Sequence, residues 1–112
     1  MRVALLSFLT GCATAADSAA GSAEPCADAP LLTYDNFGRG FLTQNCQPCH
    51  SADTIDRHGA DPSVTFDSYD EVVAEWDAIA RVATGDDPVM PPSGGVLDED
   101  REKLSIWLTC GE

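Results

Sequence analysis

The sequence of 112 residues is poor in basic side chains, with six Lys and Arg against 19 Asp and Glu and a formal net charge of −13. A surface this negative repels the phosphate backbone, so we do not expect nucleic-acid binding. The sequence also lacks a glycine-rich phosphate loop, a nucleophile paired with a base and any internal repeat. These absences argue against an enzyme. The acidity favours docking onto a partner that carries a basic patch.

The sequence also lacks a mature membrane span at its start. The apolar run at residues 3–9 is far too short to cross a bilayer, but it follows Met1-Arg2 and precedes Thr10-Gly11-Cys12. This order is typical of a secretory signal, here residues 1–11. The string Leu9-Thr10-Gly11-Cys12 also resembles a bacterial lipobox, which would make Cys12 the lipidated first residue of a membrane-anchored protein. An ordinary signal beside a bystander cysteine is the alternative.

After Cys12 the sequence has no apolar periodicity until about residue 30, and it consists largely of Ala, Ser, Gly, Asp, Glu and Pro. Such a composition buries too little apolar surface to order itself. We therefore predict a flexible tether over residues 12–33, with a reach of roughly a few tens of Å. The remaining residues, 34–112, form one small domain. The expected location is the bacterial cell envelope, on a membrane facing the periplasm.

The chemistry-bearing motif is Cys46-Gln47-Pro48-Cys49-His50, a C-x-x-C-H string of the kind that attaches c-type haem. Its two thiols can add across the haem vinyl groups as thioethers, and the adjacent imidazole then reaches the iron. A thioredoxin-like redox pair would need a βαβ setting, and the sequence shows no alternation of strands and helices. A zinc site would need a fourth ligand, for which the candidates are Cys26, Cys110 and His58.

Met90 is the candidate for the second axial ligand of such a haem. It lies in Asp87-Pro88-Val89-Met90-Pro91-Pro92, and the only other methionine, Met1, leaves with the signal. The neighbouring prolines prevent a helix and hold the backbone stiffly, which suits a thioether fixed at a metal. A gap-filling core methionine and ligation by His58 are the alternatives.

Three helical segments are expected around the motif. Thr33 can cap the first, which ends in the turn at residues 46–50. Ser68 and Glu71 form a capping box for the second, which Gly85 can end, and acidic residues 98–100 suit the start of the third. The expected apolar faces are Phe37, Phe41 and Leu42 on the first, Val72, Val73, Trp76, Ile79, Ala80 and Ala83 on the second, and Leu104, Ile106, Trp107 and Leu108 on the third.

The haem motif, Met90-Pro91-Pro92 and Trp107-Leu108-Thr109-Cys110-Gly111 together resemble the small class I cytochromes c. The likeness is to acidic monohaem domains of exported bacterial proteins, and it covers about residues 33–111. It implies an all-α cytochrome c fold, with about three helices wrapped around one covalent haem c. It also implies that Gly38 faces Trp107 where the first and last helices cross, and that the Pro62 carbonyl accepts from the Nδ1–H of His50.

Two cysteines remain once Cys12 is assigned to lipid, and Cys46 and Cys49 to haem. Class I cytochromes bring their termini together, so we expect a disulfide between Cys26 and Cys110.

The resulting hypothesis is one-electron transfer by a monomeric, membrane-tethered protein with His50 and Met90 on the iron, serving redox protein partners. One alternative is a haem site with an open distal position for a small ligand or peroxide. The other is a zinc-stapled structural module.

Overall fold

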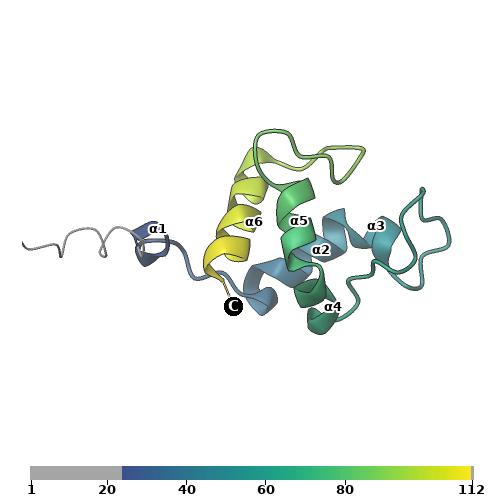
Figure 1. The fold of residues 1–112 in the computed structure, drawn as a ribbon, viewed down its shortest axis with the longest axis horizontal. Helices are drawn as coiled ribbons and strands as arrows, with labels where there is room; N and C mark the ends of the chain where they lie inside the picture. Colours follow the sequence, from purple (N-terminus) through teal and green to yellow (C-terminus); the bar gives the residue numbers. More distant parts are fainter. Residues whose placement is uncertain (1–23, 112) are drawn as a thin grey trace, which may run out of the picture.

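Figure 1 shows a computed structural model of the protein, which describes residues 24–111. Over this range all regular structure is helical, as expected, and there is no strand. The elements are α1 (Glu24–Ala27), the π-helical turn η1 (Tyr34–Gly38), α2 (Arg39–Asn45), α3 (Gln47–His50), α4 (Tyr69–Ala74), α5 (Trp76–Ala83) and α6 (Asp98–Cys110). In this part of the chain, no helix has the length and apolar character needed to cross a bilayer. The expected signal and Cys12 lie outside the described residues.

Thr33 begins the first helical segment, as predicted. Its hydroxyl accepts from the Asn36 amide at 3.1 Å, and the Asn36 side chain accepts from the Thr33 amide at 2.7 Å. These reciprocal bonds satisfy two amides that the helix itself leaves unpaired. The segment is not one continuous α-helix, because the Thr33 carbonyl accepts from the amides of both Phe37 and Gly38. A wide π turn therefore precedes α2.

The second helical segment begins with the predicted Ser68–Glu71 capping box, and both of its hydrogen bonds are present. The segment is divided at Glu75, whose backbone leaves the helical region at φ −104° and ψ 11°. Val72 is fully buried, as expected, but Val73 is 47 % exposed, so its placement on the buried face was wrong. Val73 follows Val72 directly in α4, and successive helical residues point in directions about 100° apart.

The core is centred on Trp107 of α6, whose side chain is fully buried. The rings of Tyr34, Phe37 and Trp76 surround it, with centroids 6.5, 6.3 and 4.8 Å from its own. A Cβ atom added to Gly38 would overlap the Trp107 ring, so the predicted Gly–Trp contact is confirmed. Helix α6 also lies beside α5 (Figure 1). We call this cluster of Gly38, Tyr34, Phe37, Trp76 and Trp107 the aromatic end.

Cys26 and Cys110 form the expected disulfide, with their sulfur atoms 2.05 Å apart. The bond joins α1 to the last residue of α6 across 84 positions of sequence. Residues 26–33 belong to the tether that the sequence predicts. However, Leu32 packs against the core, and the Leu31 carbonyl accepts from the Asn36 side chain. This part of the predicted tether is therefore joined to the helical unit.

Candidate cofactor site

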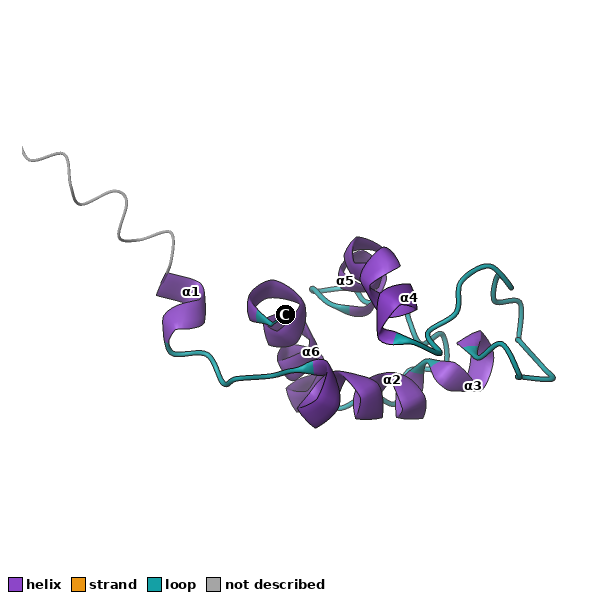
Figure 2. Ribbon diagram, turned by 90° about the horizontal axis from the view of Figure 1, so that it is seen from below, coloured by secondary structure: helices purple, strands orange, loops and turns teal. Residues whose placement is uncertain are grey.

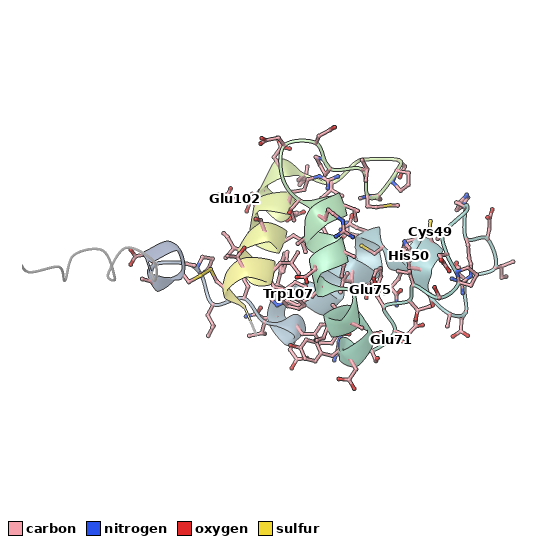
Figure 3. All side chains as sticks on the ribbon, viewed as in Figure 1. Cys49, His50, Glu71, Glu75, Glu102 and Trp107 are labelled. Atoms are coloured by element: carbon pink, nitrogen blue, oxygen red, sulfur yellow. A yellow bond between two sulfur atoms is a disulfide. The ribbon has the colours of Figure 1, made fainter. Side chains whose placement is uncertain are left out.

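An apolar cavity of about 300 Å³ is lined in part by Cys49 and His50, which lie on the opposite side of the helical unit from the disulfide (Figure 3). Cys46, Cys49, His50 and Met90 all line it, so the structure brings together the four residues expected at one haem. Most of the remaining wall is apolar, from Ala60, Val64, Phe66, Ala78, Ile79, Val82, Ala83, Pro91 and Pro92. Its polar members besides His50 are few: Asn45, Asp61 and Glu75.

A second hollow of about 460 Å³ shares Cys49, His50 and Met90 with this cavity. Arg57 and His58 from the loop after α3 line this second hollow but not the first. Figure 2 shows that loop projecting on the side of the molecule away from α1. The two hollows together form a cleft, which we call the cleft end, between α3, α5 and the loops at residues 51–67 and 84–97.

One helical turn presents the motif residues to the cleft. Cys49 and His50 follow Cys46 by three and four positions, so the three side chains lie on the same face of the turn. The Cys46 carbonyl accepts from the amides of Cys49 and His50 at 3.2 and 3.0 Å, which closes the turn. Pro48 falls in the first turn of α3, where its missing amide hydrogen costs no helical bond. Figure 3 shows Cys49 and His50 on this turn.

Asp67 fixes this turn to the other side of its loop, a role that the sequence did not reveal. Its carboxylate accepts from the Ala52 amide at 2.8 Å, the Gln47 side chain at 3.0 Å and the Ser51 hydroxyl at 3.1 Å. These donors hold the pKa of Asp67 below its ordinary value, and the Ala52 amide has the largest effect. Gln47 and Ser51 flank the Cys49-His50 pair, so the carboxylate holds the motif from both sides.

The imidazole of His50 is oriented by a backbone carbonyl. Its Nδ1 lies 2.9 Å from the Val64 oxygen. A carbonyl only accepts, so Nδ1 carries the hydrogen and Nε2 keeps its lone pair for a metal. The Phe66 ring packs beside the imidazole, with centroids 5.1 Å apart. The acceptor is therefore Val64, and the prediction of Pro62 was wrong.

A tight turn explains why the acceptor lies two residues beyond Pro62. The Val64 amide donates to the Asp61 carbonyl at 3.0 Å, and Pro62 occupies the second position of this turn, where its fixed φ is favourable. The Asp61 carboxylate also accepts from the amide and hydroxyl of Ser63, which keeps the Asp61 pKa below its usual range. Pro62 is exposed at the outside of the turn.

His58, the alternative ligand, lines only the second hollow. Its side chain is 69 % exposed and lies 3.7 Å from the Asp56 carboxylate. It has a left-handed backbone, with φ 48°, which turns the loop at this point. Met90, in contrast, is half-buried and lines both hollows.

The two motif thiols are not bonded to each other. Burial raises the pKa of the Cys46 thiol to about 11, although the charge of Arg101 acts in the opposite direction. A thiol with this pKa stays protonated at neutral pH, whereas redox-active C-x-x-C pairs rely on a lowered thiol pKa. Residues 24–111 also contain no strand, so the βαβ setting of a thioredoxin-type pair is not found there.

Two of the candidates for a fourth zinc ligand are occupied by another bond. Cys26 and Cys110 are joined in the disulfide, so neither is free to bind a metal beside Cys46 and Cys49. Across residues 24–111, no group of three or more His, Cys, Asp or Glu side chains is gathered as a metal site.

Comparisons of the chain with protein-family models, with curated proteins and with solved structures gave no match. The resemblance to class I cytochromes c therefore rests on the sequence motifs quoted above.

Proposed function

We propose that this protein is a membrane-tethered electron carrier of the cytochrome c type, with one covalent haem in the cleft. The observation that carries the proposal is the single apolar cavity onto which Cys46, Cys49, His50 and Met90 all open. Two of these residues suit thioether attachment and two suit axial ligation. The disulfide between Cys26 and Cys110 does not favour the zinc alternative, because it occupies two of the three candidates for a fourth ligand.

The residues of the cleft fit such a group in three respects. The Cys46 and Cys49 sulfurs are available for thioether bonds because neither is in a disulfide. The Nε2 of His50 is free because Val64 holds the opposite ring nitrogen. Ile79, Val82 and Phe66 supply an apolar wall that excludes water from a large flat ring.

Cys46, Cys49, His50 and Met90 would hold haem in the cleft, and it would supply one-electron chemistry there, at a reduction potential that a His/Met pair raises. The protein's part is to keep both axial side chains in place through electron transfer. The bond from His50 to the Val64 carbonyl fixes the imidazole tautomer and raises its basicity as a ligand. The acidic surface suits a redox partner with a basic face. Lipid on Cys12 would keep the carrier beside partners on the same membrane.

The decisive experiment is to produce the full chain in a bacterium that attaches haem in its periplasm. We expect the mass of the denatured protein to include one haem, and a low-spin spectrum with the Met–iron charge-transfer band when oxidised. Cys46→Ala combined with Cys49→Ala should abolish the covalent haem, whereas Pro62→Ala, at an exposed position, should retain it. Met90→Ala should remove the charge-transfer band.

Two results would replace the proposal. A colourless wild-type protein that contains zinc would establish the structural module instead. A high-spin, five-coordinate spectrum in the wild type would favour the open distal site for a small ligand.

A further inference from the structure

The backbone of Met90 is held at both of its polar atoms. Its amide donates to the Val82 carbonyl of α5 at 2.9 Å, and the Val89 amide donates to the same oxygen at 2.8 Å. Its own carbonyl accepts from Nη1 of Arg101 at 3.0 Å. The segment that carries Met90 is therefore tied to α5 through one group and to α6 through the other.

Arg101 also bonds to α5 through the same nitrogen. Its Nη1 also donates to the Ala83 carbonyl at 2.9 Å, and Ala83 is the last residue of α5. That carbonyl belongs to the final turn of α5, whose carbonyls lack helical partners. The side chain of Arg101 thus bridges the end of α5, the Met90 backbone and α6, and both bonds are partly buried.

The charge of Arg101 is also not paired with a carboxylate among the described residues. None of the ion pairs found among residues 24–111 includes Arg101, although Asp98, Glu99 and Asp100 precede it in α6. Burial has the largest effect on the Cys46 thiol and raises its pKa, while the nearby Arg101 charge lowers it. Arg101 therefore acts on both expected haem-binding segments: its charge lowers the pKa of the Cys46 thiol and its Nη1 bonds to the Met90 carbonyl.

We infer that Arg101 is a positioning residue that holds the Met90 thioether at the metal and keeps the distal side of the cleft closed. The inference rests on the proposed function, because it needs haem in the cleft. Arginine suits this role because it stays charged at all relevant pH values, and its planar group places two hydrogens of one nitrogen on two carbonyls. A charged donor makes each of these bonds stronger than a neutral one.

The consequence is an equilibrium between two states of the Met90 segment. In the closed state the thioether is held at the proposed haem, and in the open state it is released. With the Arg101 bonds made, the Met90 thioether would be held at the proposed haem; without them, the Met90 backbone keeps its amide bond to the Val82 carbonyl but its own carbonyl is released. An external ligand such as imidazole competes with Met90, so its apparent affinity measures how often the closed state opens.

The test compares Arg101→Met with Lys103→Met in the haem-loaded protein. Lys103 lies on the same helix and bonds to Glu99 at 2.7 Å, so its replacement removes one positive charge without touching Met90. For Arg101→Met we expect imidazole affinity to rise roughly tenfold or more, since two charge-assisted bonds no longer favour the closed state. The Met–iron charge-transfer band should weaken in parallel. Lys103→Met should match the wild type in both measurements.

Arg101→Lys and hydrogen exchange guard against a variant that fails to mature. Lysine keeps the charge but has a single nitrogen on a flexible stem, so imidazole affinity should fall between the wild-type and Arg101→Met values. The Val89 and Met90 amides should exchange faster in Arg101→Lys than in Lys103→Met, while amides of α4 exchange equally. This pattern would not follow from a general loss of stability.

Unchanged imidazole affinity, charge-transfer band and exchange in the Arg101 variants would overturn the inference while leaving the proposed function intact. A wild-type protein without covalent haem would overturn both. A fall in stability in Arg101→Lys with no change at the distal side would show that Arg101 only caps α5.

Discussion

The aromatic end and the cleft end of this small protein are held together by different interactions. At the aromatic end, Trp107 is fully buried among three other rings, and the disulfide joins α1 to α6 nearby. At the cleft end, two long loops surround a hollow, and polar bonds hold its rim. Figure 3 shows Trp107 and His50 well separated in the molecule.

This difference indicates which end can fold on protein contacts alone. The aromatic end buries its apolar side chains against one another, so its stability comes from packing. The cleft end arranges apolar side chains of several elements around one cavity, so the proposed haem would supply a large part of its packing. In a domain this small, a cofactor is a common replacement for missing core.

The largest expected effect is that of preventing attachment of the proposed haem. In Cys46→Ala combined with Cys49→Ala, we expect the loss of most of the domain's stability, which for about 80 residues is on the order of 5 kcal/mol. Hydrogen exchange should show protection disappearing at residues 51–67 and 84–97 before it disappears in α6. Equal losses at both ends would contradict the division between them.

The next effect is expected at the aromatic end. Replacing Cys26 and Cys110 together by Ala opens a loop of 84 residues, which the chain-entropy model values at about 4.5 kcal/mol as an upper figure. Urea unfolding should show this loss. The visible spectrum of the haem should stay as in the wild type, because neither cysteine lines the cavity. A changed spectrum would mean that the two ends are coupled.

A smaller effect should follow from one methyl group at the centre of the aromatic end. Gly38→Ala places a Cβ against the Trp107 ring, and such overpacking costs about 1–3 kcal/mol. Gly40→Ala is the matched control in α2, since a Cβ there meets nothing within 4 Å. We expect that control to be more stable than the wild type by about 0.5–1 kcal/mol, because Ala replaces Gly within a helix. Similar losses of stability in both variants would remove the case for close contact.

The aromatic end could be predicted from the sequence more fully than the cleft end. Helix geometry predicted that Thr33 and Ser68 cap the first two helical segments, and the family resemblance predicted that Gly38 contacts Trp107. All three predictions are confirmed. The break at Glu75 has no comparable signal, since glutamate is a good helix former.

At the cleft end the four side chains expected at one haem do share a cavity, but the groups that hold them were missed or misplaced. The acceptors at His50 and Arg101 are backbone carbonyls, which every residue possesses, so the sequence does not distinguish Val64 from Pro62. Arg101 follows three acidic residues at the start of α6, and this position gives no indication that its side chain bonds to the Met90 backbone.

The smallest effect is a pH-dependent one at the rim of the cleft, where Asp67 holds the motif turn. The hydrogen bond from the Ala52 amide, followed by those from Ser51 and Gln47, lowers the pKa of Asp67 from its usual 3.8. Because the folded protein then binds its proton less readily than the unfolded chain, the carboxylate stabilises the fold above that value. The contribution is lost as the pH falls through the lowered pKa.

Asp67→Asn should therefore be less stable than the wild type near neutral pH, and the difference should shrink below about pH 4. Urea midpoints measured across this range would show the trend, with Asp53→Asn, exposed on the same loop, as the control for charge. A difference that stays constant with pH would place the role of Asp67 in packing rather than in its ionised form.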